Sequence, residues 1–280
     1  MSGASTAAAG TTTYVVGDLN TNCIFGGVIS DNASPTALTK SGSATLTLTG
    51  ASTYTGGTTV NTGTLRANNT TGSSTGTGDL EIFSGATLTG TGIIGSATTV
   101  DAGATLAPGD PNGTLTISNN LTLNDSSLLQ FSLGTSSDAV AVSGDLFLTG
   151  QLSVTNTAGF GPGTYTLFSC GGTLTFDNLV LVSAPSGYNY TIDTSTPGAV
   201  KLVVAPPAPP YFGGINVAGN SLTLSGSNGT PYNYYYVLQS SNLTTWARIA
   251  TNQFDINGGF SFTTNASAGS VQNYFRLQLP

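Results

Sequence analysis

The sequence of 280 residues predicts an all-β protein, a β-solenoid followed by a small antiparallel β-sandwich. Three observations indicate this fold class. A short phrase, a glycine turn followed by Thr-Leu or Ala-Thr-Leu, recurs through the first two thirds of the chain. Apolar and polar residues alternate within the strands that follow these turns, which is the period of a β-strand. A proline-rich segment then separates the repeats from a C-terminal region richer in aromatic residues.

The composition excludes several classes of protein. Only 6% of the residues are charged, the net charge is −7 and histidine is absent, whereas an ordinary globular protein has roughly 25% charged residues. Aromatic and β-branched residues are plentiful, so the chain is not disordered. The five Lys and Arg residues are too few for a phosphate-binding patch, so nucleic acid is not expected as a partner. Apolar runs are too short for a transmembrane segment.

The N-terminal segment is expected to precede the repeats without joining them. Residues 1–13 are small and polar and are predicted to form a flexible lead-in. They lack a basic region and an apolar core, so no signal peptide is expected in this segment. Two strands are then predicted, at residues 12–18 and 23–30, with Asp18-Leu19-Asn20 between them.

The recurring phrase favours a parallel β-helix over residues 14–205. Its copies are Gly42-Ser43-Ala44-Thr45-Leu46, Gly63-Thr64-Leu65, Gly85-Ala86-Thr87-Leu88 and Gly103-Ala104-Thr105-Leu106, with looser copies at 112–115, 125–128, 150–152 and 171–174. Short strands between turns also occur in sandwiches and barrels, but sandwich strands need not resemble one another. A coil that stacks aliphatic residues inside and shows Thr outside gives this pattern. The predicted inward residues are Leu46, Leu48, Leu80, Ile82, Leu115, Ile117, Leu121, Leu123, Leu146, Leu148, Leu152 and Val154.

The stretch from Leu46 to Leu65, LTLTGASTYTGGTTVNTGTL, resembles the autotransporter-associated β-strand repeat, also called the passenger-associated transport repeat. A repeat of that family reads LTLTG-x-N-TYTGGTTV-x-x-GTL, and Ser52 stands where the family has Asn. Residues 90–95 and 106–109 are similar to its downstream segments. The resemblance covers residues 14–205 and is most specific over 40–120. It implies a right-handed parallel β-helix at a bacterial cell surface.

The solenoid is expected to end at a linker of residues 206–210, because proline cannot donate to a β-ladder. Residues 211–280 contain the single Trp and clear alternation, which predicts a small antiparallel β-sandwich of six or seven strands. The stretch from Tyr236 to Trp246, with Tyr274-Phe275-Arg276-Leu277, is similar to a module that follows such repeats in secreted proteins of Verrucomicrobia-like bacteria.

The sequence offers little for catalysis, and we predict no enzyme activity, no cofactor and no metal. Without histidine, Ser-His and Cys-His nucleophile systems and Cys/His metal sites are excluded. Glycosidase-like chemistry needs paired carboxylates, and only Asp79 and Glu81 lie two apart on a predicted strand. An exposed polar strand face is the simpler interpretation of that pair.

Two groups of side chains are candidates for interactions. The aromatic residues of the module are candidates for sugar stacking or for an interface, although one face of their strand is expected to be core. These residues are Tyr232, Tyr234, Tyr235, Tyr236 and Trp246. The two cysteines, Cys23 and Cys170, are expected to lie about 30 Å apart along the stack. A bridge within one chain is therefore not expected, whereas a bridge between successive subunits is a possible alternative to two small apolar residues.

Our main functional prediction is a non-enzymatic extracellular structural protein whose solenoids assemble end to end into a surface or matrix filament, because open solenoid ends are unpaired strand edges. A first alternative is a monomeric cell-surface adhesin stalk with residues 211–280 as the binding tip. A second is a carbohydrate-binding or polysaccharide-processing β-helix. The expected partners are other copies of the chain or cell-surface glycans, outside the cell.

Overall fold

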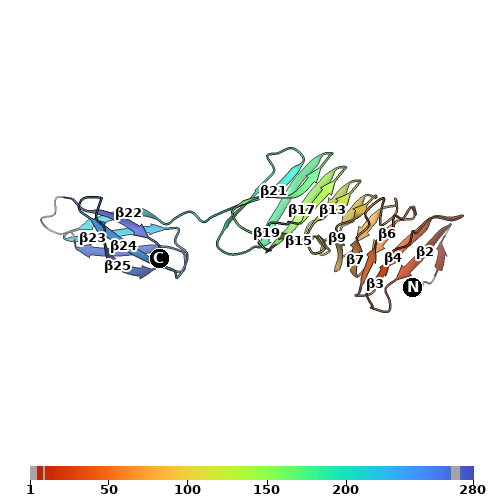
Figure 1. The fold of residues 1–280 in the computed structure, drawn as a ribbon, viewed down its shortest axis with the longest axis horizontal. Coiled ribbons are helices and arrows are strands. Elements are labelled where there is room, and N and C mark those ends of the chain that lie inside the picture. Colours follow the sequence, from red (N-terminus) through yellow and green to blue (C-terminus); the bar gives the residue numbers. More distant parts are fainter. Residues whose placement is uncertain (1–4, 9, 266–271) are drawn as a thin grey trace. The chain divides into compact units, whose positions relative to one another are not determined.

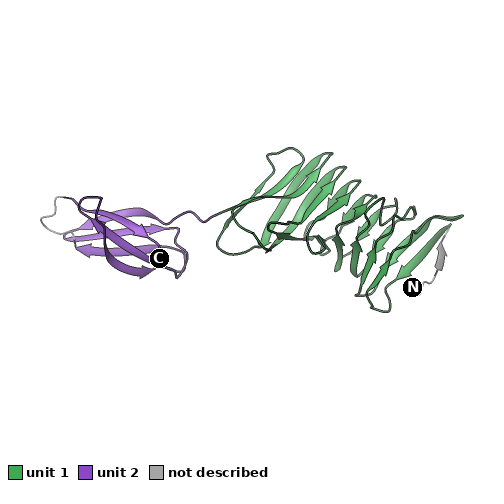
Figure 2. Ribbon diagram, viewed as in Figure 1, with its two compact units in different colours: residues 1–205 green, residues 206–280 purple. Residues whose placement is uncertain are grey.

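The computed structural model describes residues 5–8, 10–265 and 272–280. Every regular secondary-structure element found there is a β-strand. The chain divides into two compact units, residues 1–205 and 206–280 (Figures 1 and 2). The first unit is a parallel β-solenoid and the second consists of two small antiparallel sheets. The predicted all-β fold class is therefore confirmed.

The solenoid has three faces, and each circuit of the chain adds one level to the stack. The first face contains β1 (Ser5–Ala8), β2 (Thr11–Val16), β4 (Thr36–Lys40), β6 (Thr58–Val60), β8 (Leu80–Ile82), β11 (Thr98–Val100) and β14 (Leu121–Leu123). The second contains β3 (Cys23–Phe25), β5 (Thr45–Leu48), β7 (Gly63–Ala67), β9 (Ala86–Gly90), β12 (Thr105–Pro108) and β15 (Leu128–Leu133). The long strands β17 (Leu146–Asn156) and β19 (Leu174–Ser183) extend over both faces. The third contains β10 (Ile93–Ile94), β13 (Thr114–Ile117), β16 (Ala139–Val142), β18 (Gly163–Cys170), β21 (Ala199–Ala205) and β20 (Asn189–Asp193).

Equivalent residues of successive levels pair in register, so that one aliphatic row lies inside each face. On the second face this row is Leu46, Leu65, Leu88, Leu106, Leu129 and Leu152. Each of these side chains is at most 2% exposed. All the residues predicted to point inward are buried, which confirms the alternation as the source of the core. The levels share one continuous hydrophobic cluster rather than separate small cores.

The turn glycine of the recurring phrase is required by the close approach of successive levels. Gly63 has a φ of +71°, and a Cβ there would lie 2.3 Å from the carbonyl oxygen of Gly42 in the level before it. Only glycine fits a left-handed backbone in such close contact.

Tyr54 lies inside the stack and its hydroxyl is 2.5 Å from Oγ1 of Thr58. Burial raises the pKa of Tyr54 strongly, so the phenol stays protonated.

Asn and Asp side chains link each turn to the next level. The side-chain oxygens of Asn20, Asn69, Asn120 and Asp145 accept backbone N–H groups that lie 23 to 28 residues further along the chain. These bonds are 2.6 to 2.8 Å long. They satisfy N–H groups where the ladder is interrupted, and they explain why polar turn residues recur with the repeat.

Lys40 is a charged side chain inside the first-face row, at a position that sequence periodicity assigns to an aliphatic residue. It pairs with Val60 in the next level and is 1% exposed. Its Nζ donates to the carbonyl oxygens of Ser41, Gly42 and Thr62 at 2.7, 2.7 and 3.1 Å. Burial lowers the pKa of Lys40 from its ordinary value. Three carbonyl acceptors compensate for part of this desolvation.

Strand pairing at both ends of the solenoid differs from the prediction. The predicted lead-in of residues 1–13 contains β1 and the start of β2, which pair antiparallel, while residues 1–4 and 9 lie outside the described residues. The parallel stack was expected to reach residue 205, but β20 and β21 pair antiparallel with each other, and β21 pairs antiparallel with β18. This reversal ends the third face with two antiparallel strands, of which β20 is the outermost.

The second unit is a six-stranded β-sandwich. One sheet contains β22 (Tyr211–Ala218), β23 (Ser221–Ser227) and β26 (Phe260–Asn265), and the other contains β25 (Ala247–Gln253), β24 (Tyr234–Ser240) and β27 (Tyr274–Gln278). Tyr235, Val237, Phe254 and Phe260 form its buried core between the sheets. This core is separate from that of the solenoid, so we refer to residues 211–280 as the module.

Replacing Leu88 by Ala should destabilise the solenoid strongly. Leu88 is fully buried at the centre of the second-face row, so the substitution leaves a cavity and should cost about 2–5 kcal/mol of unfolding free energy. Thr87→Ala is the matched control, since Thr87 faces outward in the same strand and should change stability much less. Chemical denaturation followed by circular dichroism measures both. Equal effects of the two variants would contradict the inward row.

The stabilising effect of Asp31 should depend on pH. Its carboxylate accepts N–H of Thr36 and both N–H and Oγ1–H of Thr55 in the next level. Hydrogen bonds from Thr36 and then Thr55 lower its pKa below the ordinary value of 3.8. The stability gap between wild type and Asp31→Ala should be complete above that value and vanish as pH falls through the lowered pKa.

Denaturation midpoints measured across this acidic range give the gap directly. Asp125→Ala is the control, because its carboxylate bonds only the adjacent N–H of Ser126 in its own turn. A gap for Asp31→Ala that stays constant down to the lowest pH would show that the carboxylate charge does not stabilise the fold.

Candidate functional site

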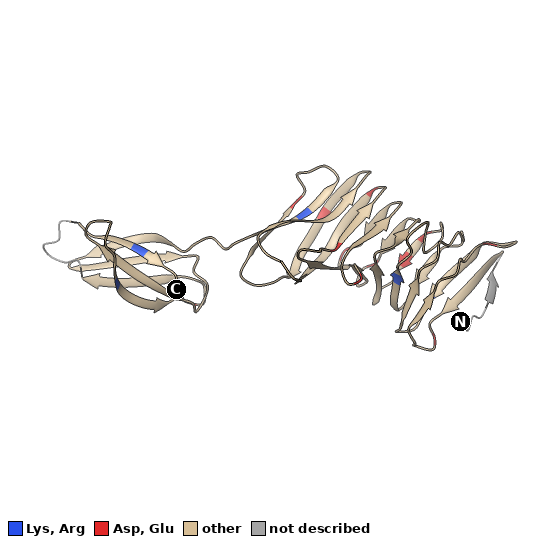
Figure 3. Cartoon of the chain, in the orientation of Figure 1, with Lys and Arg blue, Asp and Glu red and all other residues tan. Residues whose placement is uncertain are grey.

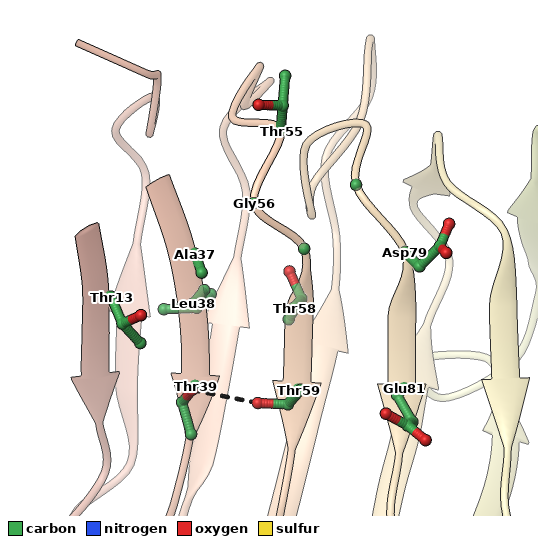
Figure 4. Close-up of a pocket in the computed structure, with 12 residues that line it drawn as sticks. Thr13, Ala37, Leu38, Thr39, Thr55, Gly56, Thr58, Thr59, Asp79 and Glu81 are labelled. Atoms are coloured by element: carbon green, nitrogen blue, oxygen red, sulfur yellow. Dashed lines mark hydrogen bonds between the residues drawn. The ribbon is translucent and has the colours of Figure 1, made fainter. Parts of the chain in front are cut away.

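The pair of carboxylates singled out from the sequence lies in an open groove on the first face. Asp79 precedes β8 and Glu81 lies within it, level with Thr59 and Thr39 of the two strands before it (Figure 4). The hydroxyls of Thr59 and Thr39 are 3.1 Å apart in adjacent levels. The other residues that line the groove are Thr, Gly, Ala and Leu. The groove is a polar strand surface in contact with water, as the simpler interpretation of the sequence expects.

The described residues give no metal centre and no membrane helix. Across residues 5–8, 10–265 and 272–280, no three His, Cys, Asp or Glu side chains are placed to hold a metal ion. The same part of the chain contains no helix with the length and apolar character needed to cross a bilayer.

The outer face of the sheet β25-β24-β27 carries an arrangement of basic and aromatic side chains. The guanidinium carbon of Arg248 lies 4.5 Å from the ring centroid of Tyr236, and that of Arg276 lies 4.5 Å from the centroid of Trp246. We call these four residues the arginine–aromatic face. Both arginines are exposed, and each guanidinium carbon lies within the distance of a cation–π interaction with its ring.

Register explains why these residues share a face. Arg248 and Arg276 both pair with Leu238, from opposite sides of β24. Tyr236 is two residues from Leu238 on the same strand, and alternation places it on the same side. Leu238 is 7% exposed, so neighbouring side chains cover it.

The loop that follows β24 holds Trp246 in position. The Ser240 hydroxyl oxygen accepts N–H of Asn242 and Leu243, and Oδ1 of Asn242 accepts N–H of Thr244 and Thr245. The indole N–H of Trp246 donates to the carbonyl oxygen of Leu243 at 3.1 Å. Leu243 has a φ of +62° and is 55% exposed, an uncommon backbone conformation for a branched apolar residue. The loop is therefore organised around the indole.

The structure divides the five aromatic residues chosen from the sequence. Tyr235 is 1% exposed and belongs to the core of the module, whereas Tyr232 and Tyr234 are 61% and 55% exposed. Tyr236 and Trp246 are half-buried beneath the arginines. Sequence reasoning missed the two arginines. The alternation in Tyr274-Phe275-Arg276-Leu277 contained a signal, since it places Arg276 opposite the inward Phe275 and Leu277.

The cysteines lie near opposite ends of the stack, and both are free thiols. Cys23 pairs with Leu46 at the start of the second-face row, and six successive pairings lead from it to Leu152. At about 4.8 Å per pairing this separation is about 29 Å. Cys170 ends a row on the third face, in the level of Leu152. A bridge within one chain is therefore excluded by distance, and a bridge between chains stays a prediction.

Comparison with known proteins identifies part of the solenoid. Residues 38–67 match the family model described as Passenger-associated-transport-repeat, which confirms the resemblance inferred from the sequence. The chain is also similar to the Adhesin BmaC autotransporter of Brucella suis biovar 1 (strain 1330), with 36% identity over 135 residues. The matched stretch is 45% of this chain but only 4% of that adhesin.

The two thiols should react at different rates. Cys23 is exposed, whereas Cys170 is half-buried, and burial followed by the nearby Asp145 carboxylate raises the pKa of Cys170. Less thiolate means slower reaction, so a thiol-specific reagent should give a fast phase that Cys23→Ser removes and a slower phase that Cys170→Ser removes. Two equal phases would contradict this account. Loss of both phases together with a dimer on a non-reducing gel would establish the bridge between chains.

Proposed function

We propose that this chain is an extracellular, passenger-like adhesin segment in which the solenoid is a rigid spacer and the module is the contacting part. The coarser part of this statement, a passenger-like β-helix related to an adhesin, follows from the matched repeat and the similar protein. The assignment of the contacting role to the module is our proposal. In the adhesin alternative of the sequence analysis the module is likewise the binding tip.

One observation carries the proposal: the solenoid pairs level after level in register through one continuous core. Each added level lengthens this unit by about 4.8 Å without creating a new surface chemistry. One outward row of the second face, for example, is made of Thr45, Thr64, Thr87 and Thr105. By contrast the module presents two exposed arginines and several aromatic rings on one sheet. These features suit a spacer that carries a separate contact surface.

A second candidate is the end-to-end filament, and a specific observation favours it. Among the described residues, the outer edges of β3 and β19 have no strand partner. β19 has ten residues and exposes Phe176, Val180 and Val182 at 37%, 47% and 50%. Unpaired edges with apolar side chains are surfaces on which another strand can add. Asp177 and two register shifts in the pairing of β19 with β17 act against such addition.

The adhesin proposal predicts that attachment depends on which end of the chain is free. Beads carrying the full chain by an N-terminal tag should be retained under flow on epithelial cells or polysaccharide films more than albumin beads. Beads carrying it by a C-terminal tag should be retained less, because the module then lies against the bead. Bead counts after a shear step measure this.

Retention at the albumin level for both orientations would reject the adhesin proposal. Equal retention in both orientations would place the contact on the solenoid instead. Fibres of indefinite length in negative-stain images of the same preparation would establish the filament.

A further inference from the structure

We infer that the arginine–aromatic face of the module binds an anionic polysaccharide, one that carries carboxylate or sulfate groups on a repeating disaccharide. This inference deepens the proposed adhesin function and rests on it, since it names the chemical class that the module would contact. The face is Tyr236, Trp246, Arg248 and Arg276.

The first argument is the distribution of charge. The chain contains five Lys and Arg residues against twelve Asp and Glu residues, and its net charge is −7. Two of the five basic residues lie in the module, where Asp255 is the one acidic residue. Figure 3 shows acidic and basic positions along the solenoid and basic positions on the strands of the module. A chain this acidic repels polyanions in general, so attraction would require a local site.

The second argument is the state of the two arginines. In the part of the chain that the structure describes, the ion pair found is Arg66 with Asp110 on the solenoid, 3.3 Å apart. Arg248 and Arg276 are exposed, and each is stacked on a ring without a carboxylate partner there. The nearest acid in sequence, Asp255, follows the far end of β25 and accepts N–H of Asn257 and Gly259.

The third argument is geometry. The guanidinium group is planar, and its N–H groups form a fork that fits the two oxygens of a carboxylate or sulfate. Both arginines pair with Leu238 from opposite sides, so their Cα atoms are two strand spacings apart, about 10 Å. That is comparable with the length of one disaccharide. The two side chains therefore start about one disaccharide apart, within reach of anionic groups on a single polysaccharide chain.

The fourth argument is preorganisation. The hydrogen bonds of residues 240–246 hold Trp246 before any ligand is present. Leu243 keeps an uncommon backbone conformation in an exposed position, where packing does not require it. Each arginine is held close to a ring by a cation–π contact, and Tyr234, 55% exposed, is free to pack against a sugar.

The test uses the full chain and three immobilised probes: hyaluronan for carboxylates, dextran sulfate for sulfates and unmodified dextran as the neutral control. Biolayer interferometry at low salt should show binding to at least one charged probe and none to dextran, and added salt should weaken it. The charged probe with the higher affinity identifies the anionic group.

Four variants locate the site. Arg248→Gln and Arg276→Gln should each weaken binding about tenfold or more, because each removes a charge-assisted contact. The double Arg→Lys variant should bind with intermediate affinity, since it keeps the charge and loses the planar donors. Lys201→Gln is the matched control, because it removes an equal charge from the solenoid and should change nothing. An unchanged melting temperature confirms that each variant is folded.

Binding to no charged probe, equal binding to dextran, or wild-type affinity in both Arg→Gln variants would overturn the inference. Loss of self-association in these variants without any change in probe binding would identify a second copy as the occupant of the face. Bead retention on cells that survives both substitutions would leave the adhesin proposal intact while the polysaccharide inference falls. Probe binding without any bead retention would leave the polysaccharide site intact and reject the adhesin proposal.

Discussion

Parallel pairing in register between successive levels is the interaction on which the rest of this structure depends. It requires that equivalent positions repeat the same side-chain type, because each residue contacts its counterparts above and below. The inner row from Leu46 to Leu152 meets this requirement with one residue type throughout. Charged rows would place like charges about 4.8 Å apart, which accounts for an outer surface of Thr and for a chain with 6% charged residues.

The same constraint explains the turns. The backbone must leave one face and enter the next within a few residues, close to the carbonyl groups of the neighbouring level, and Gly63 shows why glycine is needed there. Backbone N–H groups that have no ladder partner at the turns donate instead to Asn and Asp side-chain oxygens of the preceding level. A solenoid with these features has little freedom to place reactive groups, so the side chains that differ from the repeat are the informative ones.

Much of the fold could be predicted because repetition makes each level a copy of its neighbours. The inward residues and the burial of one face of Tyr234–Tyr236 follow from period-two alternation. The remainder depends on interactions without a periodic signal. Lys40 is buried because three carbonyl groups converge on its Nζ, and the antiparallel pairing of β20 and β21 interrupts the parallel repeat. The arginine–aromatic face arises from the pairing of β24 with two strands distant in sequence, which the sequence alone does not specify.

The most direct test of the stacked solenoid is a set of distances along one outward row. Three doubly labelled variants carry one nitroxide at Thr45 and the other at Leu128, Gln151 or Val180. These positions lie four, five and six strand pairings from Thr45, respectively. Double electron–electron resonance should give backbone separations of about 19, 24 and 29 Å, an equal increment for each level. Distances that do not increase in this order, as in a sandwich where successive strands alternate between sheets, would contradict the account.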